Sequence, residues 1–91
     1  MSNKNEKVWY HGTSQECFNK IMKEGKLHGT HSNGKRFTYL CLDKYEASAY
    51  GEVTLRVSYD PTQDLFNNNF HPGATEIKVT TPIGKANLKR V

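Results

Sequence analysis

With 91 residues, of which 35% are hydrophobic, the chain can bury only a modest core, so we expect one domain over residues 1–91, with residues 1–6 as a flexible tail. No apolar run approaches the roughly 20 residues that span a bilayer, and residues 1–7 lack the apolar centre of a secretion signal, which favours a cytoplasmic protein without a membrane partner. The formal net charge of +4 suits an acidic partner, but the lysines and arginines are scattered, as on an ordinary solvated surface.

The first predicted element is a short apolar strand, Val8 to Tyr10, followed directly by three residues suited to ligand contact. His11 offers a directional hydrogen bond from a rigid strand end, and Gly12 lets a ligand approach the backbone. Thr13 is placed to cap the next helix, whose N-terminal dipole then faces the same point. We interpret this strand end as a candidate nucleotide-binding site.

A three-turn amphipathic helix is predicted after this strand. Residues 13–16, Thr-Ser-Gln-Glu, match a capping box, and Gly25 is placed to end the helix. The apolar side chains that recur at helical spacing are Cys17, Phe18, Ile21 and Met22. Residues 27–36 are rich in glycine, asparagine, serine and histidine, so we expect a mobile loop there.

A second strand and a second helix follow the predicted loop. Residues 37–42 are rich in aromatic and apolar side chains, which predicts a strand. They lead into another capping-box pattern at residues 43–46, which opens a short helix over residues 44–50. Residues 53–59 alternate between apolar and polar side chains and predict a half-buried core strand.

The last third of the chain begins with a polar, asparagine-rich connection over residues 62–73. Residues 76–79 alternate again and predict a strand, and residues 86–91 predict a weak final one. Because the hydrophobic spacing switches several times between the helix and strand periods, we expect an α+β fold. We expect a bent pair of antiparallel sheets with a nucleotide cleft between them and two short helices packed outside.

The cysteines and the other histidines indicate no metal centre. Cys17 and Cys41 lie in apolar patterns without C-x-x-C spacing, so we interpret both as small core residues. His28, His31 and His71 match no zinc motif and have no paired thiolates beside them. We therefore expect no metal ligand in the chain.

Four residues carry a resemblance to a known family. His11 stands in the run Tyr-His-Gly-Thr, Tyr39 precedes a helix, Tyr50 follows eleven residues later, and Glu76 opens a late strand. This order resembles the ADP-ribosyltransferases of the diphtheria-toxin and poly(ADP-ribose) polymerase type, whose signature is histidine, tyrosine, glutamate. The first two parts of the signature match over about forty residues, from His11 to Tyr50.

The resemblance implies a minimal ADP-ribosyltransferase-like fold, with split antiparallel β-sheets and two short helices, and NAD+ as co-substrate. Glu76 would bind the 2′-hydroxyl of the nicotinamide ribose and stabilise the oxocarbenium-like transition state, so its interaction strengthens as the glycosidic bond breaks. His11 would anchor a ribose hydroxyl, and the backbone of Gly12 would hold the nicotinamide amide. Tyr39 and Tyr50 would clamp the nicotinamide ring between aromatic faces.

Two further residues are candidate contacts of the same dinucleotide. Thr13 belongs to the strand end that faces the ligand, and Arg36, with Lys35 beside it, precedes the Tyr39 strand and can meet the pyrophosphate. Each candidate also has a structural alternative. His11 can be an ordinary strand-end histidine, Tyr39 and Tyr50 can be packing residues, and Glu76 can be a solvent-facing charge.

These residues predict an NAD+-dependent mono-ADP-ribosyltransferase that acts on an intracellular macromolecule. One alternative is a catalytically degenerate module that binds NAD+ or ADP-ribose. Another is an RNA 2′-phosphotransferase-like enzyme, which has a similar His-Gly-Thr opening but basic site residues that are not evident in this chain. Relatives that modify arginine or asparagine carry a glutamate or glutamine where this chain has Ala74, so the acceptor can be a protein or a nucleic acid. The small size also fits a viral or mobile-element protein, which would act in the host cytoplasm.

Overall fold

The computed structural model describes residues 7–27, 30–32, 35–63 and 75–91 of the chain. The strands are β1 (Lys7–Thr13), β2 (Lys26–Leu27), β3 (Thr30–Ser32), β4 (Lys35–Cys41), β5 (Val53–Tyr59), β6 (Glu76–Val79), β7 (Ile83–Gly84) and β8 (Leu88–Arg90). The helices are α1 (Gln15–Glu24) and α2 (Lys44–Ser48), and two single 3-10 turns span Pro61–Gln63 and Lys85–Asn87.

The main sheet contains six strands, and every described strand pair in the molecule is antiparallel. Five strands follow the order β3-β4-β1-β5-β8, β6 pairs with β4, and β2 and β7 form a separate two-stranded sheet. The expected α+β class, with antiparallel sheets and two helices, is therefore confirmed. The described strands divide unequally between the two sheets, because six of them belong to one sheet and two to the other.

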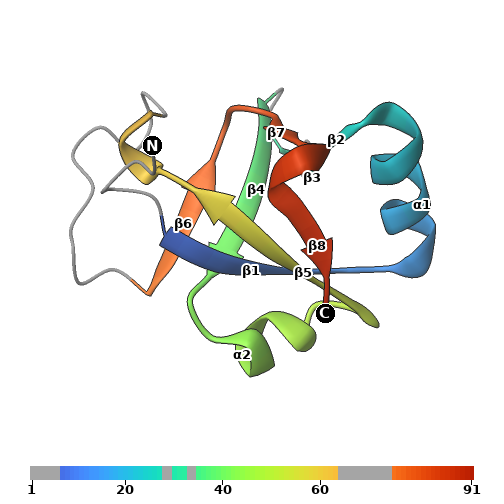
Figure 1. The fold of residues 1–91 in the computed structure, drawn as a ribbon, viewed down its shortest axis with the longest axis horizontal. Helices are drawn as coiled ribbons and strands as arrows, with labels where there is room; N and C mark the ends of the chain where they lie inside the picture. The colour runs from blue at the N-terminus through green and yellow to red at the C-terminus, as the bar shows by residue number, and fades with distance from the viewer. Residues whose placement is uncertain (1–6, 28–29, 33–34, 64–74) are drawn as a thin grey trace.

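Strand β1 lies at the centre of the main sheet, between β4 and β5 (Figure 1). Its pairing with β5 is continuous from Lys7 opposite Tyr59 to Thr13 opposite Val53. Its pairing with β4 is confined, among the described residues, to Tyr10 opposite Cys41. Strands β1 and β4 therefore share few backbone hydrogen bonds, and the main sheet has a weakly paired seam between them.

The two faces of the main sheet have different partners. Alternation places Trp9, Leu55 and Leu40 on one face, and all three are fully buried in the hydrophobic core. Helix α1 contributes Ile21 to this core, and the β2–β7 sheet contributes Leu27 and Ile83. The other residues of the core are Val53, Val57, Tyr59, Ile77 and Val79. Helix α1 and the small sheet thus cover one face of the main sheet.

Helix α2 packs on the opposite face, against the glycine of β1. A Cβ atom at Gly12 would overlap the carbonyl oxygen of Ala47 and lie 3.1 Å from the Cβ of Tyr50, so only glycine lets α2 approach this closely. Ala47 is completely buried in this contact. In Figure 1 the two helices accordingly lie at different ends of the molecule, α1 beside the small sheet and α2 beneath β1.

Several predicted elements are confirmed, two of them to the residue. Strands β5 and β6 have the predicted bounds, because strict alternation leaves only one register that buries their apolar side chains. Helix α1 ends as predicted at Gly25, which has a φ of 79° that favours glycine. Helix α2 begins where predicted, with Asp43 accepting a hydrogen bond from the Tyr45 amide, but it ends at Ser48 rather than at residue 50.

The helix cap at the start of α1 is corrected by one residue. Ser14, not Thr13, is the N-cap, and its hydroxyl accepts a hydrogen bond from the Cys17 amide over 3.1 Å. Thr13 instead continues β1, where it is buried and pairs with Val53. The predicted capping box is therefore wrong. In place of the predicted capping box, the carboxylate of Glu52, which lies in another segment, accepts a hydrogen bond from the backbone amide of Gln15.

Two other expectations are wrong. Residues 27–36, expected as a mobile loop, include the end of β2, all of β3 and the start of β4, with Thr30 opposite Phe37 and Ser32 opposite Lys35. Cys17, expected in the core, is exposed. The buried face of α1 is narrow, and Ile21 is the buried residue on it. The final strand, expected over 86–91, is the three-residue β8, and part of the predicted 62–73 connection lies outside the described residues.

No described helix is both long and apolar enough to cross a membrane.

Candidate functional site

One row of residues crosses three strands on the face that α2 covers. Tyr10 of β1 lies opposite Cys41 of β4, and Cys41 lies opposite Glu76 of β6. Directly paired residues point to the same face of a sheet, so these three side chains share the α2 face. Alternation adds Gly12 and Tyr39 to that face, each two positions from a member of the row. Residues far apart in the chain therefore meet beside α2.

Two tyrosines present their rings at this point. Tyr39 on β4 is 41% exposed, and Tyr50, just after α2, is 63% exposed. Core packing therefore leaves both rings accessible. The negative charge of Glu76 is the main cause that raises the pKa of Tyr50, with smaller effects from Cys41, burial, Glu46 and Tyr39. Tyr50 therefore lies within electrostatic reach of the Glu76 carboxylate and of Tyr39.

His11 is joined to the site through the backbone of Tyr39. Its Nδ1 lies 2.8 Å from the Tyr39 carbonyl oxygen, in the seam between β1 and β4. A carbonyl can only accept, so Nδ1 carries the proton, and burial lowers the pKa of His11 more than this hydrogen bond raises it. The imidazole is thus held neutral, with Nε2 as a hydrogen-bond acceptor. Alternation places this side chain on the core face, opposite Gly12 and Tyr39, so its printed link to the site is the backbone carbonyl of Tyr39.

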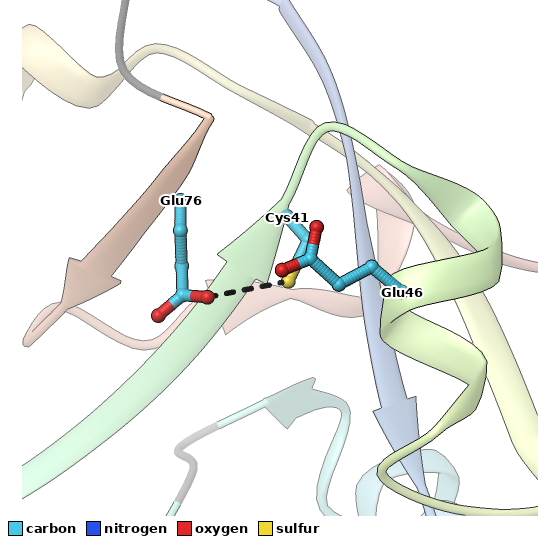
Figure 2. Close-up of side chains that lie close together, drawn as sticks. All are labelled: Cys41, Glu46 and Glu76. Atoms are coloured by element: carbon cyan, nitrogen blue, oxygen red, sulfur yellow. Dashed lines mark hydrogen bonds between the residues drawn. The ribbon is translucent and has the colours of Figure 1, made fainter.

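The close-up in Figure 2 shows two carboxylates beside a buried thiol. Cys41 Sγ and one carboxylate oxygen each from Glu46 and Glu76 lie within 4.8 Å of one another. The Cys41 thiol donates to Glu76 Oε2 over 3.9 Å, a weak hydrogen bond. Burial, followed by the charges of Glu76 and Glu46, raises the pKa of Cys41 to about 11, so the thiol remains protonated at neutral pH.

This cluster is the part of the site that sequence reasoning missed. The strand pattern explained Cys41 as core, and the capping-box pattern explained Glu46 as a local helix residue. The alternation of Tyr39 and Cys41 on one face of a predicted strand could have revealed Cys41, but only the fold brings Glu46 to Glu76. A thiol and two carboxylates are donor types that metals use.

Thiol alkylation is expected to distinguish the two cysteines. At pH 8, iodoacetamide should modify the exposed Cys17, while Cys41 should react about a hundredfold more slowly than an ordinary cysteine, because its raised pKa removes most of the thiolate. Mass spectrometry of timed digests measures both rates, and unfolding in urea serves as the control in which both thiols react. Equal rates for the two thiols in the folded protein would show that Cys41 is accessible and ionised.

The remaining candidate residues are placed less favourably. Thr13 is buried on the core face, opposite Val53, and so points away from Gly12 and Tyr39. Gly12 lies in the site, but α2 approaches it so closely that the absence of a side chain has a structural cause. Arg36 pairs with His31 along the strand, but its side chain lies outside the described part of the structure, as does that of Lys35.

Comparison of the chain with models of protein families, with curated proteins and with solved structures finds no match.

Proposed function

We propose that the chain is an NAD+-dependent mono-ADP-ribosyltransferase with a minimal form of that family's fold, acting on a macromolecular acceptor. The observation that carries the proposal is the presence of Tyr39, Tyr50 and Glu76, from three separate segments, beside α2 on one face of the main sheet. The resemblance named these four residues from their order in the sequence alone. The shared face of Tyr39, Tyr50 and Glu76 is an independent reason to assign these three residues one ligand, whereas His11 lies on the core face and is linked to Tyr39 through the backbone carbonyl.

The proposed reaction breaks the bond between the ribose C1′ and the nicotinamide nitrogen. The bonding electrons leave with the nitrogen, so nicotinamide departs as a neutral molecule and positive charge develops on the ribose. The carboxylate of Glu76 is exposed and available to accept a hydrogen bond from the ribose 2′-hydroxyl. Its negative charge then favours the oxocarbenium-like transition state over the ground state.

The other residues fit the binding of the same dinucleotide. The acceptor Nε2 of a neutral His11 suits a ribose hydroxyl, which can donate a hydrogen bond to it. The exposed rings of Tyr39 and Tyr50 suit the flat, cationic nicotinamide ring, and the nearby Glu76 charge favours the same cation. The proposed backbone contact of Gly12 gains no support from the fold, because α2 already occupies the open side of this glycine. The proposed roles of Thr13 and Arg36 gain no support from the fold.

The proposal is tested by measuring binding and turnover of NAD+ separately. We expect calorimetry to detect NAD+ binding, and chromatography to detect nicotinamide released in proportion to the enzyme added, with radiolabel from adenine-labelled NAD+ transferred to lysate macromolecules. His11→Ala should weaken NAD+ binding. Binding without nicotinamide release would mean a degenerate NAD+-binding module. The absence of both would refute the proposal.

A further inference from the structure

The row of paired residues that contains Tyr10 and Cys41 continues across the other half of the main sheet. Tyr10 of β1 lies opposite Arg56 of β5, and Arg56 lies opposite Lys89 of β8. These three strands lie side by side in Figure 1. Because directly paired residues point to the same face of a sheet, the two cations are neighbours beside the tyrosine, on the α2 face. Both Arg56 and Lys89 are exposed.

This part of the sheet has a surplus of positive charge. Strands β1, β5 and β8 contain no aspartate or glutamate, and their four cations are Lys7, Arg56, Lys89 and Arg90. Among the described residues, neither Arg56 nor Lys89 forms an ion pair. Like charges that lie directly opposite each other across two strands are destabilising. Keeping these two cations side by side therefore costs the fold stability, and a bound anion would offset that cost.

Apolar and aromatic side chains adjoin the two cations. Val8 lies two positions before Tyr10 on the same face of β1, and it is 36% exposed although β1 is a central strand. Tyr10 is only half-buried. Ser58, opposite Val8, adds a hydroxyl to the same face. An accessible aromatic ring beside cations is the combination that binds single-stranded nucleic acid, because bases stack on the ring and phosphates pair with the cations.

The carboxylates of the candidate site lie at the far end of the same row. Glu76 is three strands away from Arg56, which corresponds to roughly 14 Å because neighbouring strands are about 4.8 Å apart. This separation exceeds the Debye length of about 8 Å at physiological ionic strength. Salt therefore screens the repulsion between Glu76 and a phosphate bound at Arg56, and the basic end of the row can bind an anion that the acidic end would repel.

We propose that Tyr10, Arg56 and Lys89 form a basic surface that binds single-stranded nucleic acid. A base stacks on the Tyr10 ring, and neighbouring phosphates contact Arg56 and Lys89. Stacking and phosphate contacts carry little sequence information, so we expect binding with little sequence preference. None of these residues is a proposed contact of NAD+, so the basic surface does not depend on the proposed function.

Fluorescence anisotropy of a labelled oligothymidine of about 12 nucleotides, a usual length for small single-strand-binding domains, tests the two cations. Full-length wild type is compared with a variant that carries Arg56→Gln and Lys89→Gln. The control variant carries Lys20→Gln and Lys23→Gln, which remove the same charge from exposed positions on α1. We expect the first variant to bind at least about tenfold more weakly, and the control to stay within about twofold of wild type.

The salt dependence of binding provides a second readout. Each phosphate contact with a single strand contributes about 0.7 to the slope of log affinity against log salt concentration, so loss of two contacts should reduce the slope by about 1.4. Tyr10→Leu should weaken binding at least about fivefold without changing this slope, because it removes stacking and no charge. Tyr10→Phe keeps the ring and should bind as wild type does. Circular dichroism establishes that the variants are folded.

Four outcomes would overturn the proposal. Wild-type protein that does not bind the oligonucleotide would exclude the basic surface, and equal weakening in the two charge variants would mean attraction by net charge alone. A DNA duplex of the same length that binds as tightly as the single strand would exclude base stacking. Polyglutamate that competes as well as unlabelled oligothymidine would assign the surface to acidic protein segments. Nicotinamide release is measured separately, so each of these outcomes leaves the proposed function open to its own test.

Discussion

Replacing Glu76 with glutamine is expected to reduce nicotinamide release by at least about a hundredfold, with little change in NAD+ affinity. Glutamine keeps the size of the side chain and a carbonyl that can accept a hydrogen bond, but it removes the negative charge that the developing ribose cation requires. The loss should appear in kcat rather than in KM, because the charge acts mainly in the transition state. Initial rates and calorimetric affinities measure the two effects.

A surface carboxylate supplies the matched control for this variant. Glu16→Gln removes one negative charge from α1 and should leave both kcat and KM unchanged. Circular dichroism should show both variants folded, because the Glu76 side chain is exposed and its hydrogen bond from Cys41 is long. Nicotinamide release or label transfer that survives in Glu76→Gln at the wild-type rate would refute the catalytic role of Glu76.

Replacing Gly12 with alanine is expected to destabilise the fold by about 3 kcal/mol, at the upper end of the usual range for overpacking. The new methyl group would overlap the backbone carbonyl of Ala47, which cannot rotate away as a side chain could, so α2 would have to move off the sheet. Urea denaturation measures the change in the free energy of unfolding. Because α2 leads into Tyr50, a proposed contact of NAD+, nicotinamide release should fall as well.

A second glycine provides the comparison. At Gly84 an added Cβ would meet nothing within 4 Å, so Gly84→Ala should change the free energy of unfolding by less than about 0.5 kcal/mol. If the two variants were equally stable, α2 would have to adjust freely over β1. That result would remove the structural reason for glycine at position 12, and a ligand contact would then be the better explanation for this residue.

The sequence predicted best the elements whose pattern is purely local. Strict alternation defined β5 and β6, and a glycine of positive φ defined the end of α1. The composition of residues 27–36 was misleading, because glycine and asparagine were interpreted as a loop. The Asn33-Gly34 sequence is a typical signal of a two-residue hairpin, which agrees with the pairing of Ser32 with Lys35.

The candidate site was predictable only in part. The order of His11, Tyr39, Tyr50 and Glu76 was visible in the sequence, and the last three meet beside α2. The contribution of Glu46 and Cys41 depends on strand pairing and on the seating of α2, neither of which has a local signal. The N-cap prediction at Thr13 was wrong because strand pairing with Val53 prevailed over the capping preference of threonine and turned its side chain into the core.

The sparse pairing of β1 with β4 gives the sheet a natural bending line. On one side of it stand β1 and β5, on the other β4 and β6, and the described hydrogen-bonding links across it include the Tyr10–Cys41 bridge and the imidazole of His11. A small rotation of one half against the other would sacrifice few hydrogen bonds. A ligand bound at this line would contact both halves of the sheet at once, and its binding would make the whole sheet more rigid.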